Sequence, residues 1–98
     1  MDDPLKILKA NLDGLKLTPE QEDDLKATFE AVVDLAKRAA AGEDVTRDTL
    51  HVRAQVMAWK AGALSASQAA LWSAAKDYAD YGGAIIRRVV MAAVGGLI

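Results

Sequence analysis

The sequence predicts an all-α protein of about four helices, in which three short helices precede a long, alanine- and glycine-rich apolar C-terminal helix. Three observations support this fold class. Alanine, the residue with the highest helix propensity, accounts for 20 of the 98 residues. Helix start signals recur along the chain, and apolar residues repeat at spacings of three and four. The length predicts a single helical domain over residues 1–98, because a second hydrophobic core would not fit.

The first helix is expected to begin at Pro4, since proline is favoured at the first helical position and Asp3 can serve as the N-cap. Its apolar side chains follow the helical repeat, and Gly14 marks its end. These side chains are Leu5, Leu8, Leu12 and Leu15.

The second helix has the clearest start signal in the chain. Thr18 is followed by Pro19 and, at the third helical position, by Gln21, which is the spacing of a capping box. Gly42 is expected to end the helix. One face is apolar and the opposite face is charged, as in an amphipathic surface helix. The apolar face consists of Leu25, Phe29, Val32, Ala36, Ala39 and Ala40.

The third helix is expected from Thr46 or Arg47 to Ala61, with Asp44 or Thr46 as its cap. It carries apolar residues on two nearly opposite faces, which is typical of a helix between two neighbours. One face holds Leu50, Ala54, Met57, Ala61 and Leu64, and the other holds Val52, Val56, Trp59 and Ala63.

The C-terminal helix is expected to begin at Ser65, where a second capping-box spacing ends at Gln68. An apolar stripe from Leu71 to Leu97 keeps one helical phase across Gly82–Gly83. The pattern therefore favours a single helix of about 45 Å, either straight or kinked at these glycines. Two shorter helices that meet at these glycines are the alternative.

The last ten residues, Val89 to Ile98, carry no charge, and three short helices would hardly cover them on every side. We expect this tail to pack against other copies or other proteins. In the first alternative it folds back and covers the core of its own bundle. In the second it meets a membrane, although ten residues span only about 15 Å of a hydrocarbon layer of about 30 Å. A longer span would have to include Arg87 and Arg88, so no convincing transmembrane span is predicted.

The single domain has two parts. Residues 1–64 form the acidic part with the amphipathic helices, and residues 65–98 form the C-terminal helix with its apolar tail. Residues 1–50 contain seven basic and twelve acidic side chains, whereas residues 51–98 contain five basic and two acidic ones. This polarity favours contact between an acidic and a basic surface, within one subunit or between copies. Nucleic-acid binding is not expected, because the basic residues are not clustered among aromatic ones.

The residue types that carry most enzymatic and metal chemistry are sparse. There is no cysteine, and His51 is the only histidine. Glu43, Asp44 and Asp48 lack the spacing and the central glycine of a calcium-binding loop, and helix capping explains them more simply. Gly82–Gly83 lacks the lysine and hydroxyl residue of a phosphate loop. We therefore expect no enzyme, no catalytic or cofactor-binding residue, no metal site and no cofactor.

The sequence therefore predicts a non-enzymatic structural or interaction protein that self-associates or docks into a larger assembly through its C-terminal helix. In composition it resembles the small alanine-rich helical proteins of phage-type and other large bacterial assemblies, which implies a virion or particle component. The start of the chain lacks a secretory signal, so a cytoplasmic or within-particle location is expected. A membrane-active protein of holin, pore or peripheral type is the alternative, and a small inhibitor or adaptor of a host protein is the third.

Ten residues are predicted to form the contact surface. Tyr81 and Trp59 lie off the main apolar stripes and belong to residue types enriched at interface hot spots. Arg87 and Arg88 are expected to meet solvent, a polar lumen or an acidic partner surface. The predicted buried seam consists of Ile85, Ile86, Val89, Val90, Ala93 and Leu97.

Overall fold

A computed structural model describes residues 4–12, 14–61 and 65–95 of the chain, without the side chains of residues 59–61 and 65–68. The described residues form five helices, and no strand occurs among them. The helices are α1 (Pro4–Leu12), α2 (Pro19–Ala40), α3 (Thr46–Ala61), α4 (Ser65–Tyr81) and α5 (Ala84–Val94). The all-α class is thus confirmed.

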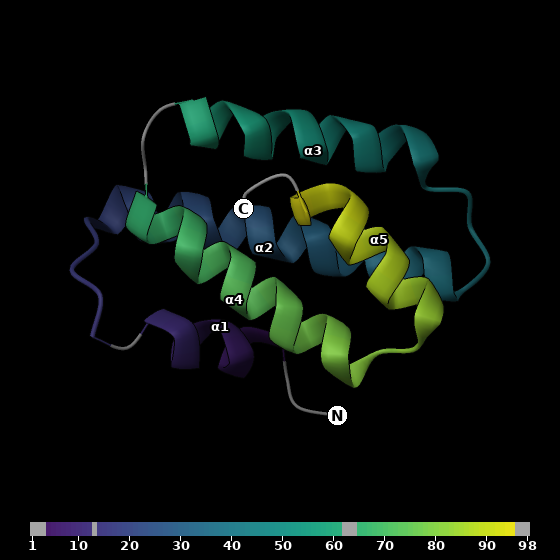
Figure 1. The fold of residues 1–98 in the computed structure, drawn as a ribbon, viewed down its shortest axis with the longest axis horizontal. Helices are drawn as coiled ribbons and strands as arrows, with labels where there is room; N and C mark the ends of the chain where they lie inside the picture. The colour runs from purple at the N-terminus through teal and green to yellow at the C-terminus, as the bar shows by residue number, and fades with distance from the viewer. Residues whose placement is uncertain (1–3, 13, 62–64, 96–98) are drawn as a thin grey trace.

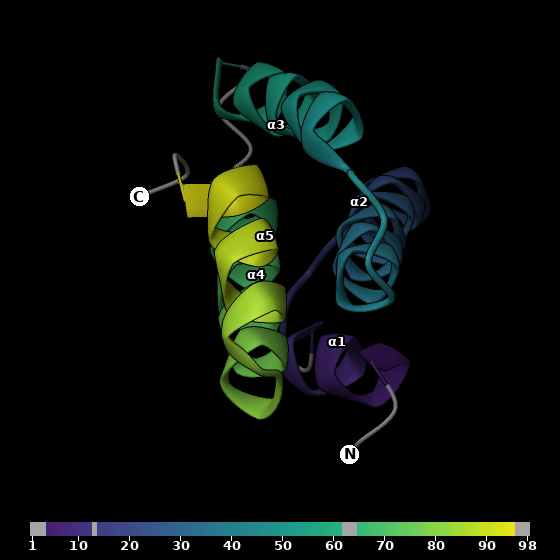
Figure 2. The same ribbon diagram turned by 90° about the vertical axis from the view of Figure 1, so that its right-hand side faces the viewer.

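The helices surround one core. Figure 2 shows α2 on one side and α4 with α5 on the other, while α3 and α1 close the two ends. Helix α5 contacts α2, α3 and α4, and helix α1 packs mainly on α4 (Figure 1). The largest fully buried side chains come from α2 to α5, so each of these helices contributes to the same core. These side chains are Tyr78, Phe29, Leu25, Leu71, Val32, Val56, Val90 and Val94.

The prediction of about four helices with a long apolar one at the C-terminus was wrong. Helix α4 ends at Tyr81, α5 begins at Ala84, and no long apolar helix is found in the described part of the chain. Glycine has low helix propensity, so Gly82–Gly83 is a weak point in any helix. The chain turns there and packs Val90 and Val94 into the core at 0% exposure. Burial of this face outweighs the helical hydrogen bonds lost at the turn.

The expected helix boundaries in the first two-thirds of the chain are confirmed. Gly14 and Gly42 have φ angles of 84° and 94°, a backbone conformation that glycine adopts at little cost, and α1 and α2 end shortly before them. At the start of α3, the backbone N–H of Thr46 donates to Asp44 Oδ1 over 3.1 Å. Asp3, the expected cap of α1, lies outside the described residues.

The two apolar faces of α3 are covered unequally. Among the described side chains, Val52 and Val56 are buried in the core. On the other face Met57 is partly buried against the core, whereas Leu50 is 62% exposed and Ala54 is exposed. Neighbours within the chain therefore cover the Val52 face and only part of the opposite one.

The capping box at the start of α2 is confirmed, and it leads to a stability prediction. The backbone N–H of Gln21 donates to Thr18 Oγ1 over 3.2 Å, and the backbone N–H of Thr18 donates to Gln21 Oε1 over 3.0 Å.

Thr18→Ala removes one acceptor and should lower the free energy of unfolding by about 0.5–2 kcal/mol in a denaturant titration. Thr18→Ser keeps the hydroxyl and should lose much less. Association should be unchanged in both variants, since Thr18 lies outside the predicted contact surface. Equal losses of stability in the two variants would show that the hydroxyl does not stabilise the helix.

Candidate interaction surface

The predicted contact residues lie on and around α5, but they do not all face the same way. Successive residues of a helix are about 100° apart, which separates the residues of α5 into a buried and an exposed side. Val90 and Ala93 have 0% exposure, and they face α2 and α3 as part of the protein's own core. Ile86 and Val89 lie at the edge of the core and are partly buried. These four residues are therefore covered, wholly or in part, by the chain itself.

The outer side of α5 carries the exposed members of the predicted set. Ile85 is 52% exposed, and Arg88, one turn further on, is exposed as well. Ala92 continues the same face at the next turn and is also exposed. Tyr81, at the last position of α4, is 59% exposed on the other side of the two-glycine turn. Two large exposed hydrophobic side chains and a cation thus flank the α4–α5 turn.

Arg87 differs from Arg88 in its contacts. Its Nη2 lies 3.4 Å from Asp80 Oδ1, so the two side chains form an exposed ion pair across the turn. Such pairs contribute little to stability, and this one leaves the guanidinium largely open to solvent. Within the part of the chain described, no acidic side chain pairs with Arg88. The α5 side of the turn therefore keeps a positive charge that a partner can contact.

Helix α1 adds to this surface, which the sequence did not indicate. A shallow cleft next to Tyr81 is lined by Lys6, Ile7, Ala10 and Asp77. The side-chain amide of Asn11 donates to Asp77 Oδ2 over 3.1 Å and so fixes α1 against α4. Helical periodicity along α1 could not show this, because the contact joins residues 66 positions apart. Trp59 and Leu97, also predicted as contact residues, cannot be placed, since the Trp59 side chain and residues 96–98 lie outside the described residues.

A second group of charged residues links α2 to α3. The guanidinium of Arg38 contacts Asp48 Oδ2 at 2.9 Å, Glu43 Oε2 at 3.5 Å and Asp34 Oδ2 at 3.6 Å. The hydrogen bond to Asp48 raises the pKa of Arg38, with further contributions from the nearby carboxylates. Among the described residues, no group of three histidine, aspartate or glutamate side chains is placed to hold a metal ion. We interpret the Arg38 cluster as a structural link between the two helices.

Tyr78 places a polar atom in the core. Its side chain has 0% exposure, and its hydroxyl is buried with no hydrogen-bond partner in the part of the chain described. Loss of water around the hydroxyl raises the pKa of Tyr78. Its ring packs edge to face against Phe29, with ring centroids 6.4 Å apart. Helical periodicity places Tyr78 in the core, but it could not show that the hydroxyl would lack a partner.

Comparison with known proteins adds no relative: no protein family, curated protein or solved structure matches this chain. None of the helices within residues 4–12, 14–61 and 65–95 is long and apolar enough to cross a membrane.

Proposed function

We propose that this protein is a non-enzymatic interaction protein that associates with copies of itself, and through them builds a larger assembly, by way of its C-terminal helix. The observation that carries the proposal is the pair of exposed hydrophobic side chains that flank the α4–α5 turn, Tyr81 and Ile85, together with Arg88, which pairs with no acidic side chain among the described residues. Tyrosine and arginine are enriched at interface hot spots, and apolar side chains next to them exclude water. We call Tyr81, Ile85, Arg88 and Ala92 the outer face.

Charge complementarity supports a second copy as the partner. The only charged residues of α5 are two arginines, whereas the exposed side of α2 carries several carboxylates, among them Glu30 and Asp34. Figure 2 shows α2 and α5 on different sides of the core, so the outer face of one molecule can meet the acidic side of the next. Such a contact joins two different surfaces and forms rings or open chains of copies.

Sedimentation at several protein concentrations tests the proposal. Ile85→Asp places a charge in the centre of the outer face and should weaken association at least about tenfold, as the loss of an interface anchor does. Arg88→Glu should also weaken it and should change its dependence on salt. Leu50→Asp is the matched control, because Leu50 is more exposed than Ile85 but lies on α3. It should leave association unchanged.

Two results would contradict the proposal. The first is a full-length protein that stays monomeric at high concentration. The second is an equal effect of Ile85→Asp and Leu50→Asp. If the first result is accompanied by binding to anionic liposomes, the protein is instead a peripheral membrane protein in which the arginines contact lipid headgroups.

A further inference from the structure

Helix α5 fills a cradle formed by α2, α3 and α4, and only Gly82 and Gly83 connect it to α4. We propose that α5 exchanges between two copies of this chain, so that the α5 of each copy fills the cradle of the other. The cradle then makes the same contacts with the partner's α5 as it makes with its own. Exchange of an identical element costs little for this reason, and short connections under steric constraint favour it. This inference does not rest on the proposed function, because it needs no contact through the outer face.

The apolar stripe shows what the exchanged form looks like. The stripe keeps one helical phase across Gly82–Gly83, so a straight helix over residues 65–94 places the apolar sides of α4 and α5 in line. Such a helix is about 45 Å long. The longest extent of the folded chain is 38 Å, so α5 would protrude beyond its own bundle. Its Val90 and Val94 would then be uncovered until the cradle of a second copy receives them. The same stripe therefore suits both the folded-back and the straight form.

Gly82 is the residue that distinguishes the two forms. In the folded-back turn, a Cβ atom at Gly82 would lie 2.5 Å from Ile86 Cγ2 and 2.7 Å from Ile86 Cβ. Ile86 cannot move aside easily, because its β-branched side chain is stiff and its Cβ is fixed to the backbone of α5. A Cβ atom at Gly83 would meet no atom within 4 Å. The turn thus tolerates a side chain at Gly83 but not at Gly82, whereas a straight helix accepts alanine at both positions.

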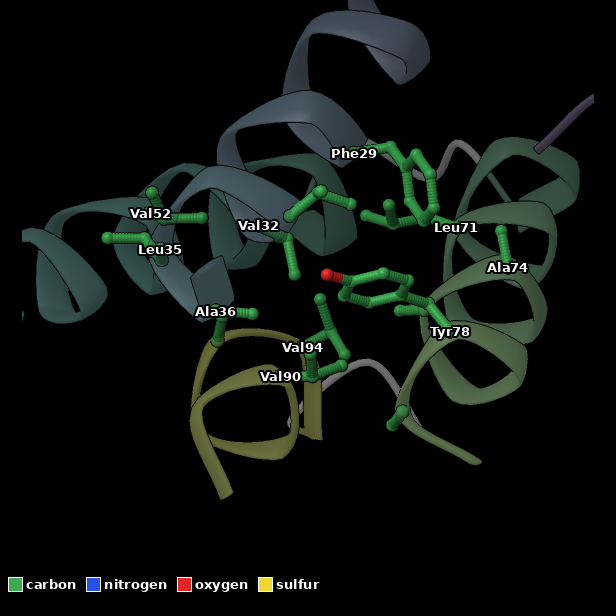
Figure 3. Packing of buried hydrophobic residues seen from close by; sticks show 14 of the residues in the cluster. Phe29, Val32, Leu35, Ala36, Val52, Leu71, Ala74, Tyr78, Val90 and Val94 are labelled. Carbon is green, nitrogen blue, oxygen red and sulfur yellow. The ribbon is translucent and has the colours of Figure 1, made fainter. Parts of the chain in front are cut away.

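The core beneath α5 lowers the cost of opening. The Tyr78 hydroxyl points into the space between Val32 and Val94 and has no partner there among the described residues (Figure 3). A buried hydroxyl without a hydrogen bond loses its contacts with water and gains none in exchange, which destabilises the closed form. When α5 leaves, water reaches this hydroxyl and the loss is recovered. Tyr78→Phe should therefore slow the exchange, because the closed form no longer carries this penalty.

The experiment compares Gly82→Ala with Gly83→Ala by sedimentation. All variants carry Ile85→Asp, which removes the outer-face contact, and because this substitution is common to all of them it does not affect the comparison between Gly82→Ala and Gly83→Ala. Gly83→Ala gains helix propensity without a steric conflict, by about fivefold for each of the two copies in a dimer, so its shift of the monomer–dimer equilibrium should not exceed about 30-fold. Gly82→Ala gains the same propensity and also removes the steric conflict on leaving the turn, so it should shift the equilibrium towards the dimer by more than about 100-fold. Equal shifts would overturn the inference.

Exchange itself is read from mixed copies. The chain has no cysteine, so Ala92→Cys accepts a single spin label on α5. Spin-labelled copies are mixed with isotopically enriched copies that carry no spin label. Both kinds of copy carry Gly82→Ala and Ile85→Asp. Exchange predicts that the amide signals of α2 and α3 in the enriched copies broaden. If Gly82→Ala does not fold, the protein that keeps Gly82 is used instead and is held just below its melting temperature, where the same amide signals should broaden. In the Tyr78→Phe variant of that protein the broadening should develop more slowly. No broadening in that sample would overturn the inference, whereas loss of association through Ile85→Asp alone concerns only the proposed function.

Discussion

A chain shortened to residues 1–88 should lose its cooperative thermal transition and most of its helical circular-dichroism signal. The deletion removes Val90, Ala93 and Val94, which have 0% exposure between α2, α3 and α4. Full burial of a valine side chain contributes about 1.5–3 kcal/mol, and the deletion also exposes the side chains that these residues cover. Since small domains are stable by only about 5–15 kcal/mol, the loss is a large part of the total.

Two point variants on α5 separate loss of the core from loss of the tail as such. Val90→Asp places a charge at a fully buried position and should unfold the protein much as the deletion does. Ala92→Asp, two residues further on, lies on the exposed side and should change stability by less than about 1 kcal/mol. A shortened chain that melts cooperatively and runs as a monomer would contradict this expectation. It would show that the tail serves contact with other molecules alone.

The parts of this fold that could be predicted from the sequence are those with local causes. Thr18 and Gln21 are three residues apart, and the hydrogen bonds between them need only the backbone of one turn. The helix ends near Gly14 and Gly42 likewise follow from the φ angles that glycine permits. No distant residue takes part in these features, and the pattern alone was enough.

The direction of α5 could not be predicted in the same way. An apolar stripe shows which side of a helix is buried, but it does not show which residues cover that side. Whether Val90 is buried by its own chain or by another depends on contacts with α2, at least 50 positions away in sequence, and with α3, at least 29 positions away. The same ambiguity affected α3, where Val52 is covered and Leu50 is not. Helical periodicity treats the two faces alike, and tertiary packing distinguishes them.

The candidate surface shows the same division. Tyr81 lies off the apolar stripe, so its exposure agrees with the helical pattern, whereas a continuous helix would have placed Ile85 on the stripe and the turn at Gly82–Gly83 leaves it exposed. The contribution of α1 comes from its packing on α4, with Ile7 and Leu8 buried and the exposed hydrogen bond from Asn11 to Asp77 as an additional contact that has no local signal in the sequence. Residue types indicated which side chains suit an interface. The turn determined which of them are free to form one.

Phe29→Ala should destabilise the protein more than any other single truncation within α2. The Phe29 side chain has 0% exposure and packs edge to face against Tyr78, with an angle of 79° between the rings. Removing a buried phenylalanine side chain costs about 3–5 kcal/mol, because apolar contacts are lost and a cavity remains. For a domain of this size, that loss lowers the melting temperature by more than about 12 °C. Calorimetry at constant protein concentration measures both quantities.

Two further variants show how much of this loss comes from the ring pair. Phe29→Leu fills most of the volume but removes the aromatic contact with Tyr78, which contributes about 0.5–1.5 kcal/mol beyond burial. We expect it to fall between the wild-type protein and Phe29→Ala. Leu50→Ala truncates a side chain that is 62% exposed and should change stability by less than about 0.5 kcal/mol. If Phe29→Ala cost no more than Leu50→Ala, Phe29 could not lie between α2 and α4, and the core that supports α5 would have to be arranged differently.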